Sequence, residues 1–225
     1  MRDFALDLYD YGLQQKSLEQ IVAELFPNSA TTIQSAISNT QWLQDHITAF
    51  FASLKSEKYP SKKKPYPTEY SIDNKSGLFL YLLCKITKPK QIVETGVAYG
   101  LSSMYVLQSL KENENGALHS IDGVFSPWQT KEMIGVAIPP NLKNRWQFNF
   151  GSSSDKLSAV LSSLGSVDIF LHDSLHTYKN MMFEFETAWP YISRGGFLIS
   201  DDIGDNNAFY DFCTKLDLDF TTLKQ

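Results

Sequence analysis

The sequence has little cysteine, no long apolar run and no excess of positive charge, and each shortage excludes a class of protein. Cys84 and Cys213 are the 2 cysteines in 225 residues. They lack CxxC or histidine partner spacing, which argues against a disulfide framework or a thiolate metal site. The apolar runs fall short of the roughly 20 residues that a membrane span needs. A net charge of −5, with no basic stripe beyond Lys62–Lys64, argues against a general nucleic-acid binder.

The chain does contain enough apolar material for one main domain. Hydrophobic residues make up 43% of the sequence and aromatic residues 13%, which suffices for a substantial single core. The N-terminus shows no apolar leader that ends in a small-residue cleavage site. We therefore expect a cytoplasmic protein that binds a small molecule and has neither a membrane nor a nucleic acid as its partner.

The N-terminal quarter of the chain differs in pattern from the rest. Residues 3–57 predict helices because apolar residues recur at spacings of three and four, and residues 26–29 separate two such patterns. The segment YPSKKKPYP at 59–67 is rich in proline and lysine, which disfavours a helix or a central strand. We predict a helical N-terminal extension over 1–58, a Pro/Lys-rich linker over 59–69 and the main domain over 70–225.

Beyond the linker, short apolar strands alternate with helical patterns. This alternation predicts right-handed crossovers and a mostly parallel sheet with helices on both faces, a Rossmann-like doubly wound α/β fold. In such folds ligands bind at the carboxyl ends of the strands. The predicted strands are 91–95, 118–122, 146–150, 167–172, 197–200 and 219–223, and the predicted helices are 78–86, 102–112, 126–135, 154–164, 178–193 and 205–217.

The first strand ends in the loop IVETGVAYGLSS. Gly96 and Gly100 allow a tight turn and close backbone approach, and Ser102 lies at the following helix N-terminus. A dinucleotide loop has three glycines spaced G-x-G-x-x-G, whereas this loop reads E-x-G-x-x-x-G. Glu94 would repel a diphosphate and suits an ammonium or sulfonium group. The loop therefore opposes an NAD-dependent dehydrogenase, although a tight turn without any ligand remains an alternative.

The second and third strands end in groups that suit a nucleoside. Asp122, in LHSIDGV, is placed to accept hydrogen bonds from vicinal ribose hydroxyls. The third strand ends in FNFGSSSD, where Gly151 and Ser152–Ser154 offer small polar groups for an adenine edge. With the loop at Glu94, the three strand ends describe adenine, ribose and a cationic amino-acid tail.

The fourth and fifth predicted strands end in carboxylates. Asp173 follows the apolar run of VDIFLHDSLHTY, and Asp201 and Asp202 end RGGFLISDDI, in which Gly195–Gly196 is expected to be the turn before the strand. Unpaired carboxylates near a core are costly, and neighbouring strands would bring these three together. Oxygen ligands without cysteine suit a hard divalent cation such as Mg²⁺. Helix N-caps or solvated loop acids are the alternative interpretation.

These motifs, in this order over about residues 70–223, resemble the class I S-adenosylmethionine-dependent methyltransferases. Within that class the chain is most similar to the cation-dependent O-methyltransferases of the catechol, caffeoyl-coenzyme-A and macrolide-sugar type. The resemblance implies that the methionine end, the ribose and the adenine of the cofactor are bound by Glu94, Gly96, Gly100, Ser102, Asp122, Gly151, Ser153, Ser154 and Asp173.

The resemblance also implies a metal and a base. Asp173, Asp201 and Asp202 match the metal ligands of the relatives, where the third is often an amide. His176 matches the Lys or His that removes the hydroxyl proton, a role that suits imidazole, whereas His172 is expected in the core. We predict an O-methyltransferase that uses S-adenosylmethionine and Mg²⁺ on a small hydroxylated acceptor, with Asp173 and His176 as catalytic residues.

Two other functions remain open at this point. The acids could be structural in a metal-independent N- or O-methyltransferase, or the chain could be a cofactor-binding module without turnover. The extension is expected to cover the acceptor side of the pocket or to form a homodimer contact. Relatives usually add a sixth and an antiparallel seventh strand, so either the sheet is short or the sequence is truncated after Gln225.

Overall fold

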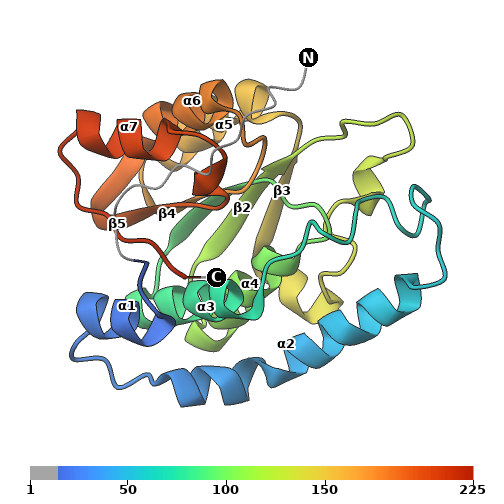
Figure 1. Cartoon of the computed structure of the whole chain (residues 1–225), viewed down its shortest axis with the longest axis horizontal. Helices are drawn as coiled ribbons and strands as arrows, with labels where there is room; N and C mark the ends of the chain where they lie inside the picture. The colour runs from blue at the N-terminus through green and yellow to red at the C-terminus, as the bar shows by residue number, and fades with distance from the viewer. Residues whose placement is uncertain (1–14, 225) are drawn as a thin grey trace.

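A five-stranded parallel sheet lies at the centre of the computed structural model, which describes residues 15–224 (Figure 1). The strand order is β3-β2-β1-β4-β5, and every neighbouring pair is parallel. This order confirms the predicted doubly wound sheet. The strands are β1 (Gln91–Thr95), β2 (Ala117–Asp122), β3 (Trp146–Phe150), β4 (Val167–His172) and β5 (Ile192–Ser200).

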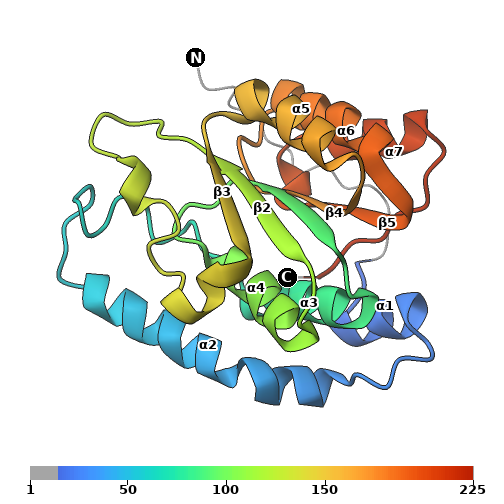
Figure 2. The ribbon, with the colours of Figure 1, turned by 180° about the vertical axis from the view of Figure 1, so that it is seen from behind.

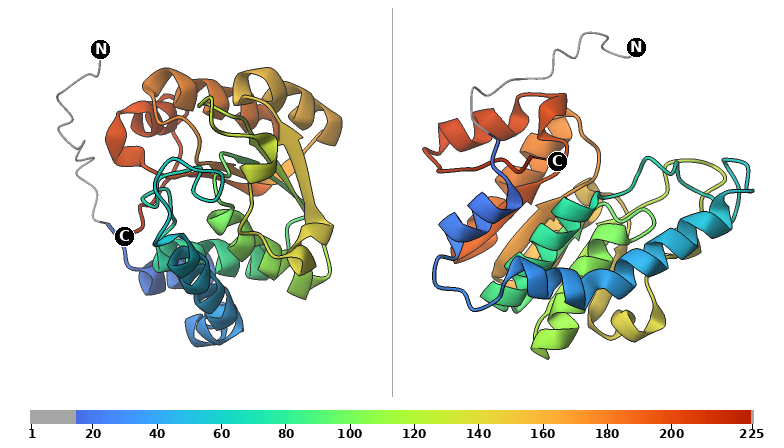
Figure 3. Two further views of the ribbon diagram at one scale, coloured as in Figure 1. Left: turned by 90° about the vertical axis from the view of Figure 1, so that its right-hand side faces the viewer. Right: turned by 60° about the horizontal axis from the view of Figure 1, so that its bottom comes forward.

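Helices cover both faces of the sheet (Figure 2). Three of them, α5, α6 and α7, lie on one face, and α1, α3 and α4 lie on the other, where α2 runs across α3 and α4 (Figure 3). The helices are α1 (Leu18–Leu25), α2 (Ile33–Leu54), α3 (Asn74–Thr87), α4 (Leu101–Asn113), α5 (Ser153–Leu164), α6 (Tyr178–Ala188) and α7 (Ala208–Lys215), with 3₁₀ turns η1 (Lys131–Met133), η2 (Pro140–Arg145), η3 (Trp189–Tyr191) and η4 (Ile203–Asp205).

The sheet is buried between two apolar layers because its strands are apolar on both faces. In β1, Ile92 belongs to the core on the α3 and α4 side, and Val93 belongs to the core beneath α5, α6 and α7. Ile169 and Phe170 of β4 divide in the same way, as expected for a fully covered parallel sheet. Leu18 of α1 shares the first core, so the N-terminal helices pack on the main domain. The predicted helical residues 3–14 lie outside the described residues.

The predicted helix at 126–135 is wrong. The 3₁₀ turn η1 forms there instead, and Gly135 has a φ of 67°. The N–H groups of Gly135 and Ala137 donate to the carbonyls of Ala98 and Tyr99 at 2.8 and 3.1 Å. The backbone of this segment is therefore bonded to the loop after β1, a long-range contact that local periodicity does not reveal.

Two predicted helix boundaries are also wrong. α6 ends at Ala188 rather than at residue 193 and is followed by the 3₁₀ turn η3, in which Pro190 has no N–H to donate to an α-helical hydrogen bond. α7 begins at Ala208 rather than at residue 205, where the side chain of Asn206 accepts a hydrogen bond from the Ala208 N–H at 2.9 Å.

The end of the sheet differs from expectation at two places. Gly195 and Gly196 lie inside β5 rather than before it, at an irregularity of its pairing with β4. Residues 219–223 form no sixth strand, and a single parallel bridge instead pairs Leu223 with Lys16. The Lys16 N–H donates to the Thr222 carbonyl, and the Lys224 N–H donates to the Lys16 carbonyl, both at 2.9 Å. This segment therefore ties the C-terminal end to the start of α1.

Candidate functional site

The loop after β1 turns on two glycines with positive φ. Gly96 has a φ of 84°, and a Cβ placed on it would lie 1.8 Å from the carbonyl oxygen of Asp173. Gly100, at the start of α4, has a φ of 89°, and its Cβ would lie 2.5 Å from the Ile138 side chain. Both glycines thus permit close contact with protein atoms. The contact at Gly96 brings the β1 loop directly against the residue that follows β4.

Asp122, at the end of β2, holds this loop in place. One carboxylate oxygen accepts the N–H groups of Val97 and Ala98, both at 2.9 Å, and the other accepts the N–H of Gly123 at 2.7 Å. Burial raises the pKa of Asp122, and these three N–H donors oppose the rise. A carboxylate can accept about four hydrogen bonds, so Asp122 retains capacity for one more donor.

Glu94 lies beneath the loop and has no exposed surface. Its carboxylate accepts the hydroxyl groups of Ser102 at 3.0 Å and of Ser103 and Ser120 at 2.7 Å. Burial raises the pKa of Glu94, and the three hydroxyl donors oppose that rise. Contact between Glu94 and a cofactor stays a prediction, and in this structure the three serines cover the carboxylate.

The third strand end adds a helix N-terminus beside β2. Ser152 caps α5 and accepts the N–H of Asp155 at 3.3 Å. Ser153, in the first turn of α5, donates to Asn180 at 3.5 Å. Gly151 lies close to the loop after β2, because its N–H donates to the Asp122 carbonyl at 2.9 Å. The predicted nucleoside residues therefore lie on neighbouring loops.

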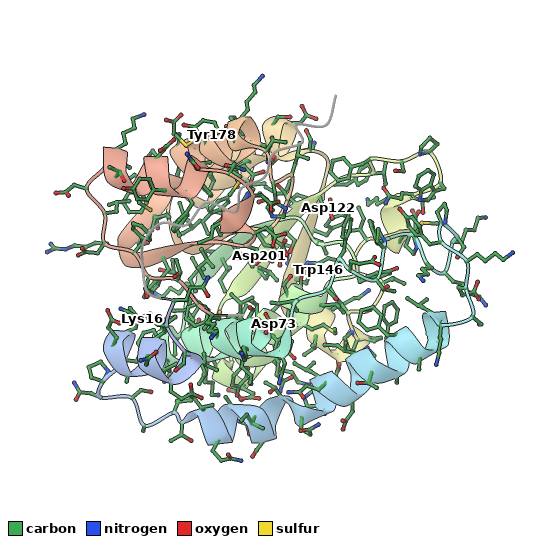
Figure 4. The ribbon with its side chains drawn as sticks, viewed as in Figure 1. Lys16, Asp73, Asp122, Trp146, Tyr178 and Asp201 are labelled. Carbon is green, nitrogen blue, oxygen red and sulfur yellow. The ribbon has the colours of Figure 1, made fainter. Side chains whose placement is uncertain are left out.

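Carboxylates follow β4 and β5 at the same edge of the sheet; Figure 4 labels Asp201 here and Asp122 after β2. The N–H of Asp201 donates to the His172 carbonyl at 3.0 Å, which joins the two loops. Burial, and then the negative charge of Asp201, raise the pKa of Asp173 well above its usual range. Burial and Asp201 also raise the pKa of Asp202, a shift that His176 opposes. These loops therefore concentrate like charges.

His176 lies between two of these acids. Its Nδ1 lies 3.6 Å from Asp202 and its Nε2 lies 3.9 Å from Asp173. Burial, and then the neighbouring His172, lower the pKa of His176, although the nearby carboxylates oppose this. Within residues 15–224 its Nε2 is buried and has no hydrogen-bond partner. The ring therefore offers a basic nitrogen beside Asp173 and Asp202.

Asp205 joins this group and was missed by sequence reasoning. One ligand atom each from His176, Asp202 and Asp205 lie within 4.8 Å of one another, a spacing that could hold a metal ion. The turn η4 brings Asp205 back toward Asp202, with Asp205 N–H donating to the Asp202 carbonyl at 3.1 Å. The acid-rich run DDIGD could have indicated Asp205 as a ligand. The residue was instead assigned to the predicted helix at 205–217. The predicted set of Asp173, Asp201 and Asp202 stays a prediction.

A buried acid and histidine pair behind the site was also missed. His172 and Glu184 have no exposed surface, and His172 Nδ1 lies 2.6 Å from a Glu184 oxygen. Glu184 also accepts the hydroxyls of Thr95 at 2.5 Å and Ser174 at 2.7 Å. The signal for Glu184 is a carboxylate within the apolar stripe of α6, whose neighbours Met181 and Phe185 are buried. The pair joins α6 to the ends of β1 and β4.

A cavity of about 810 Å³ opens beside the acidic loops. Of the predicted site residues it brings together Ser102, Asp173, Asp201 and Asp202, and Asp205 lies on its wall as well. The remaining predicted residues do not line it: Glu94, Gly96, Gly100, Asp122, Gly151, Ser153, Ser154 and His176. Glu94 and Asp122 instead face the serine hydroxyls and loop amides described above.

Comparisons with known proteins identify a domain and a fold. A family model described as a methyltransferase domain matches residues 93–203, from β1 to the turn after β5. No match to the chain was found among curated proteins. No described helix is long and apolar enough to cross a membrane.

Solved methyltransferases share the fold at low sequence identity. An O-methyltransferase from Bacillus cereus in complex with SAH aligns with a TM-score of 0.53 and 16% identity, over 89% of this chain and 83% of that chain. Cofactor-bound Rv0187 from MTB aligns with a TM-score of 0.55 and 17% identity, over 91% of this chain and 85% of that chain. A methyltransferase from Geobacter sulfurreducens aligns with a TM-score of 0.52 and 13% identity, over 87% of each chain.

The parallel sheet in the order 3-2-1-4-5, the glycine loop after β1 and the matched domain define one class of protein. The matched segment is a methyltransferase domain, and the chain has the class I S-adenosylmethionine-dependent methyltransferase fold. Its fold resembles that of O-methyltransferases.

Proposed function

We propose that this enzyme transfers a methyl group from S-adenosylmethionine to a hydroxyl oxygen of a small molecule, with the help of a divalent cation. One observation carries the proposal. Asp173, Asp201, Asp202 and Asp205 line a single cavity that also reaches Ser102, at the start of the helix after the glycine loop. A base, His176, lies 3.6 to 3.9 Å from two of these acids.

The cofactor half of the site is assigned to the loops after β1, β2 and β3. Asp122 can accept one further hydrogen bond, which suits a ribose hydroxyl. Ser102 lines the cavity and is held by the Glu94 carboxylate at 3.0 Å, so Glu94 acts on the methionine end through Ser102. Gly151, Ser153 and Ser154 remain the residues proposed for adenine.

The donors present fit a divalent cation. They are carboxylates, and burial, followed by the negative charge of Asp201, raises the pKa of Asp173 and Asp202. Oxygen ligands suit Mg²⁺. Two overlapping ligand sets share Asp202: the set predicted from the sequence adds Asp173 and Asp201, and the set whose ligand atoms lie within 4.8 Å of one another adds His176 and Asp205. A bound divalent cation would orient an acceptor hydroxyl and lower its pKa.

The protein's own part in the reaction is positioning and proton transfer. The acceptor oxygen attacks the methyl carbon, an O–C bond forms, and the S–C bond breaks with its electron pair left on sulfur. His176 accepts the hydroxyl proton, for which a positioned base contributes about 10²–10⁴-fold in rate. Catalysis otherwise comes from holding oxygen, carbon and sulfur in line.

Turnover with labelled S-adenosylmethionine on a panel of hydroxylated and aminated small molecules tests the proposal. We expect label on oxygen, loss of turnover in chelator and recovery with Mg²⁺. Full activity in chelator would instead support a metal-independent enzyme. SAH binding by calorimetry without turnover on any acceptor would support a binding module.

Binding of Mn²⁺, followed by its electron paramagnetic resonance signal, distinguishes the two ligand sets. Asp202→Asn should weaken binding at least about tenfold in either case. Asp201→Asn should weaken it only if the first set holds the ion, and Asp205→Asn only if the second does. Asp217→Asn is the matched control, because Asp217 is exposed and asparagine tolerates its φ of 54°.

His176→Ala separates a base from a ligand. A base alone should leave Mn²⁺ affinity unchanged while turnover falls by about 10²–10⁴-fold. A parallel loss of Mn²⁺ affinity would assign His176 to the ligand set with Asp205.

A further inference from the structure

The wall of the cavity carries charge of one sign. Of the described residues that line it, six are acidic and none is Lys, Arg or His. The six are Glu24 on α1, Asp173 after β4, Asp201, Asp202 and Asp205 after β5, and Asp219 in the C-terminal segment. This bias exceeds what a metal site at the strand ends alone requires, because Glu24 and Asp219 lie outside either ligand set.

Bound cations would not reverse the sign of this wall. One divalent cation and the single net positive charge of S-adenosylmethionine oppose three of six formal negative charges. Lys16 pairs with Glu24 at the rim and opposes one more. The wall thus stays negative, and a narrow cleft lined by one sign of charge concentrates its field.

Besides neutral polar side chains, the wall carries apolar side chains from both helix layers. Ile72 and Phe79 contribute from the α3 side, Phe197 and Ile199 from β5, and Phe209 and Phe220 from α7 and the C-terminal segment. Rings and aliphatic side chains at these places suit a molecule with an apolar body. The pairing of Lys16 with residues 222–224 joins the two segments that carry Glu24 and Asp219.

We infer that the methyl acceptor is a small hydroxylated molecule with an apolar body and no anionic group. This inference rests on the proposed function, and it names the class of acceptor. Carboxylates, phosphate esters and coenzyme A thioesters would each bring negative charge against the acidic wall, which no described Lys or Arg lines. A neutral or amine-bearing acceptor meets no such repulsion.

Three sets of phenols and aliphatic alcohols, matched in size and differing only in a neutral, amine or carboxylate substituent, test this inference. Binding to the full chain is measured by saturation-transfer NMR with SAH and Mg²⁺ present. We expect binders among the neutral and amine sets, and affinities at least about tenfold weaker for the carboxylate partners, since like charges in a partly buried site repel strongly. High salt should narrow that gap.

A charge-reversal variant shows whether the wall causes the selection. Glu24→Lys combined with Asp219→Lys should raise carboxylate affinity about tenfold relative to the neutral partners. Glu69→Lys combined with Glu114→Lys makes the same change in net charge at exposed residues outside the wall. This control variant should leave the order of affinities among the three sets of compounds unchanged.

Each result is decisive. Preferential binding of carboxylates by the unmodified protein would overturn the inference, as would the absence of binders in all three sets. If the charge-reversal variant shows the same relative affinities as the unmodified protein, the acidic wall is not the cause of the selection against carboxylates. Neutral or amine compounds that bind but are never methylated would contradict the proposed function and leave the inference on ligand charge standing.

Discussion

The two halves of the site differ in how their charged groups are satisfied. On the proposed cofactor side, Glu94 and Asp122 are buried, and each accepts three hydrogen bonds from the protein. On the proposed acceptor side, Asp173 and Asp202 face His176 at 3.9 and 3.6 Å, and burial, followed by the negative charge of Asp201, raises the pKa of both carboxyl groups. The first half is preorganised by its own donors, whereas the second concentrates charge that a bound cation would relieve.

This difference indicates a division of work. A buried carboxylate with its hydrogen bonds made fixes backbone geometry at little further cost when a ligand enters. A cluster of half-buried like charges is unfavourable without a counter-ion. We therefore expect changes on the cofactor side to act mainly through folding and loop geometry, and changes on the acceptor side to act mainly on cation binding and turnover.

The largest effect should come from Gly96→Ala. A Cβ at Gly96 would lie 1.8 Å from the Asp173 carbonyl oxygen at a φ of 84°, so the β1 loop and the residue after β4 could not both keep their places. We expect a loss of at least about 3 kcal/mol in unfolding free energy, or failure to fold. Urea denaturation followed by circular dichroism measures it.

Gly165→Ala is the matched control. Gly165 has a similar φ of 74°, but a Cβ added to it would meet nothing within 4 Å, so only the left-handed strain of about 1–2 kcal/mol should appear. Equal losses of unfolding free energy in the two variants would show that the close contact between Gly96 and Asp173 contributes nothing to stability. The two halves of the site would then not be linked through this contact.

An intermediate effect should come from Glu184→Gln. Glu184 accepts hydrogen bonds from Thr95 and Ser174 and pairs with His172 at 2.6 Å. An amide there leaves buried groups mismatched, at about 1–3 kcal/mol each. Glu186→Gln on the same helix is the control, since its pair with Lys215 is exposed and should contribute far less to the unfolding free energy than the buried groups around Glu184.

The pH dependence of that difference follows from the pKa of Glu184. Burial raises this pKa, but His172 and Thr95 lower it by more, so the folded value lies below the usual one. The stabilisation is therefore present above the unfolded pKa of about 4.3 and is lost as pH falls through the folded value. The gap between wild type and Glu184→Gln should shrink below about pH 4. A gap independent of pH would contradict an ionised Glu184.

The sequence predicted the sheet well because its strands are buried on both faces. Ile92 and Val93 face opposite cores, so the apolar run is continuous and recognisable. Residues at strand ends, such as Asp122, Asp173 and Asp201, could be assigned to one edge because parallel strands end there together.

The parts that sequence reasoning missed depend on contacts between distant elements. Asp205 joins His176 only because the loops after β4 and β5 lie together, and Glu184 meets His172 only after α6 packs on the sheet. Local patterns also could not show that Gly135 bonds to the β1 loop. The direction in which a side chain points was the hardest feature to predict. Glu94 and Asp122 lie at the expected strand ends, but their carboxylates face serine hydroxyls and loop amides.

The smallest effect should come from Glu94→Gln, which keeps the shape of the side chain and removes its charge. Burial raises the folded pKa of Glu94, so wild type loses stability as pH rises from the unfolded value through the folded one. The variant lacks that loss, which offsets the cost of replacing one acceptor oxygen by a donor among Ser102, Ser103 and Ser120. At pH 7 its unfolding free energy should therefore lie within about 1 kcal/mol of wild type. SAH affinity by calorimetry should persist in Glu94→Gln and fall in Ser102→Ala, because Ser102 lines the cavity and Glu94 does not. Equal losses of affinity in both variants, without a change in stability, would mean that Glu94 contacts the cofactor directly.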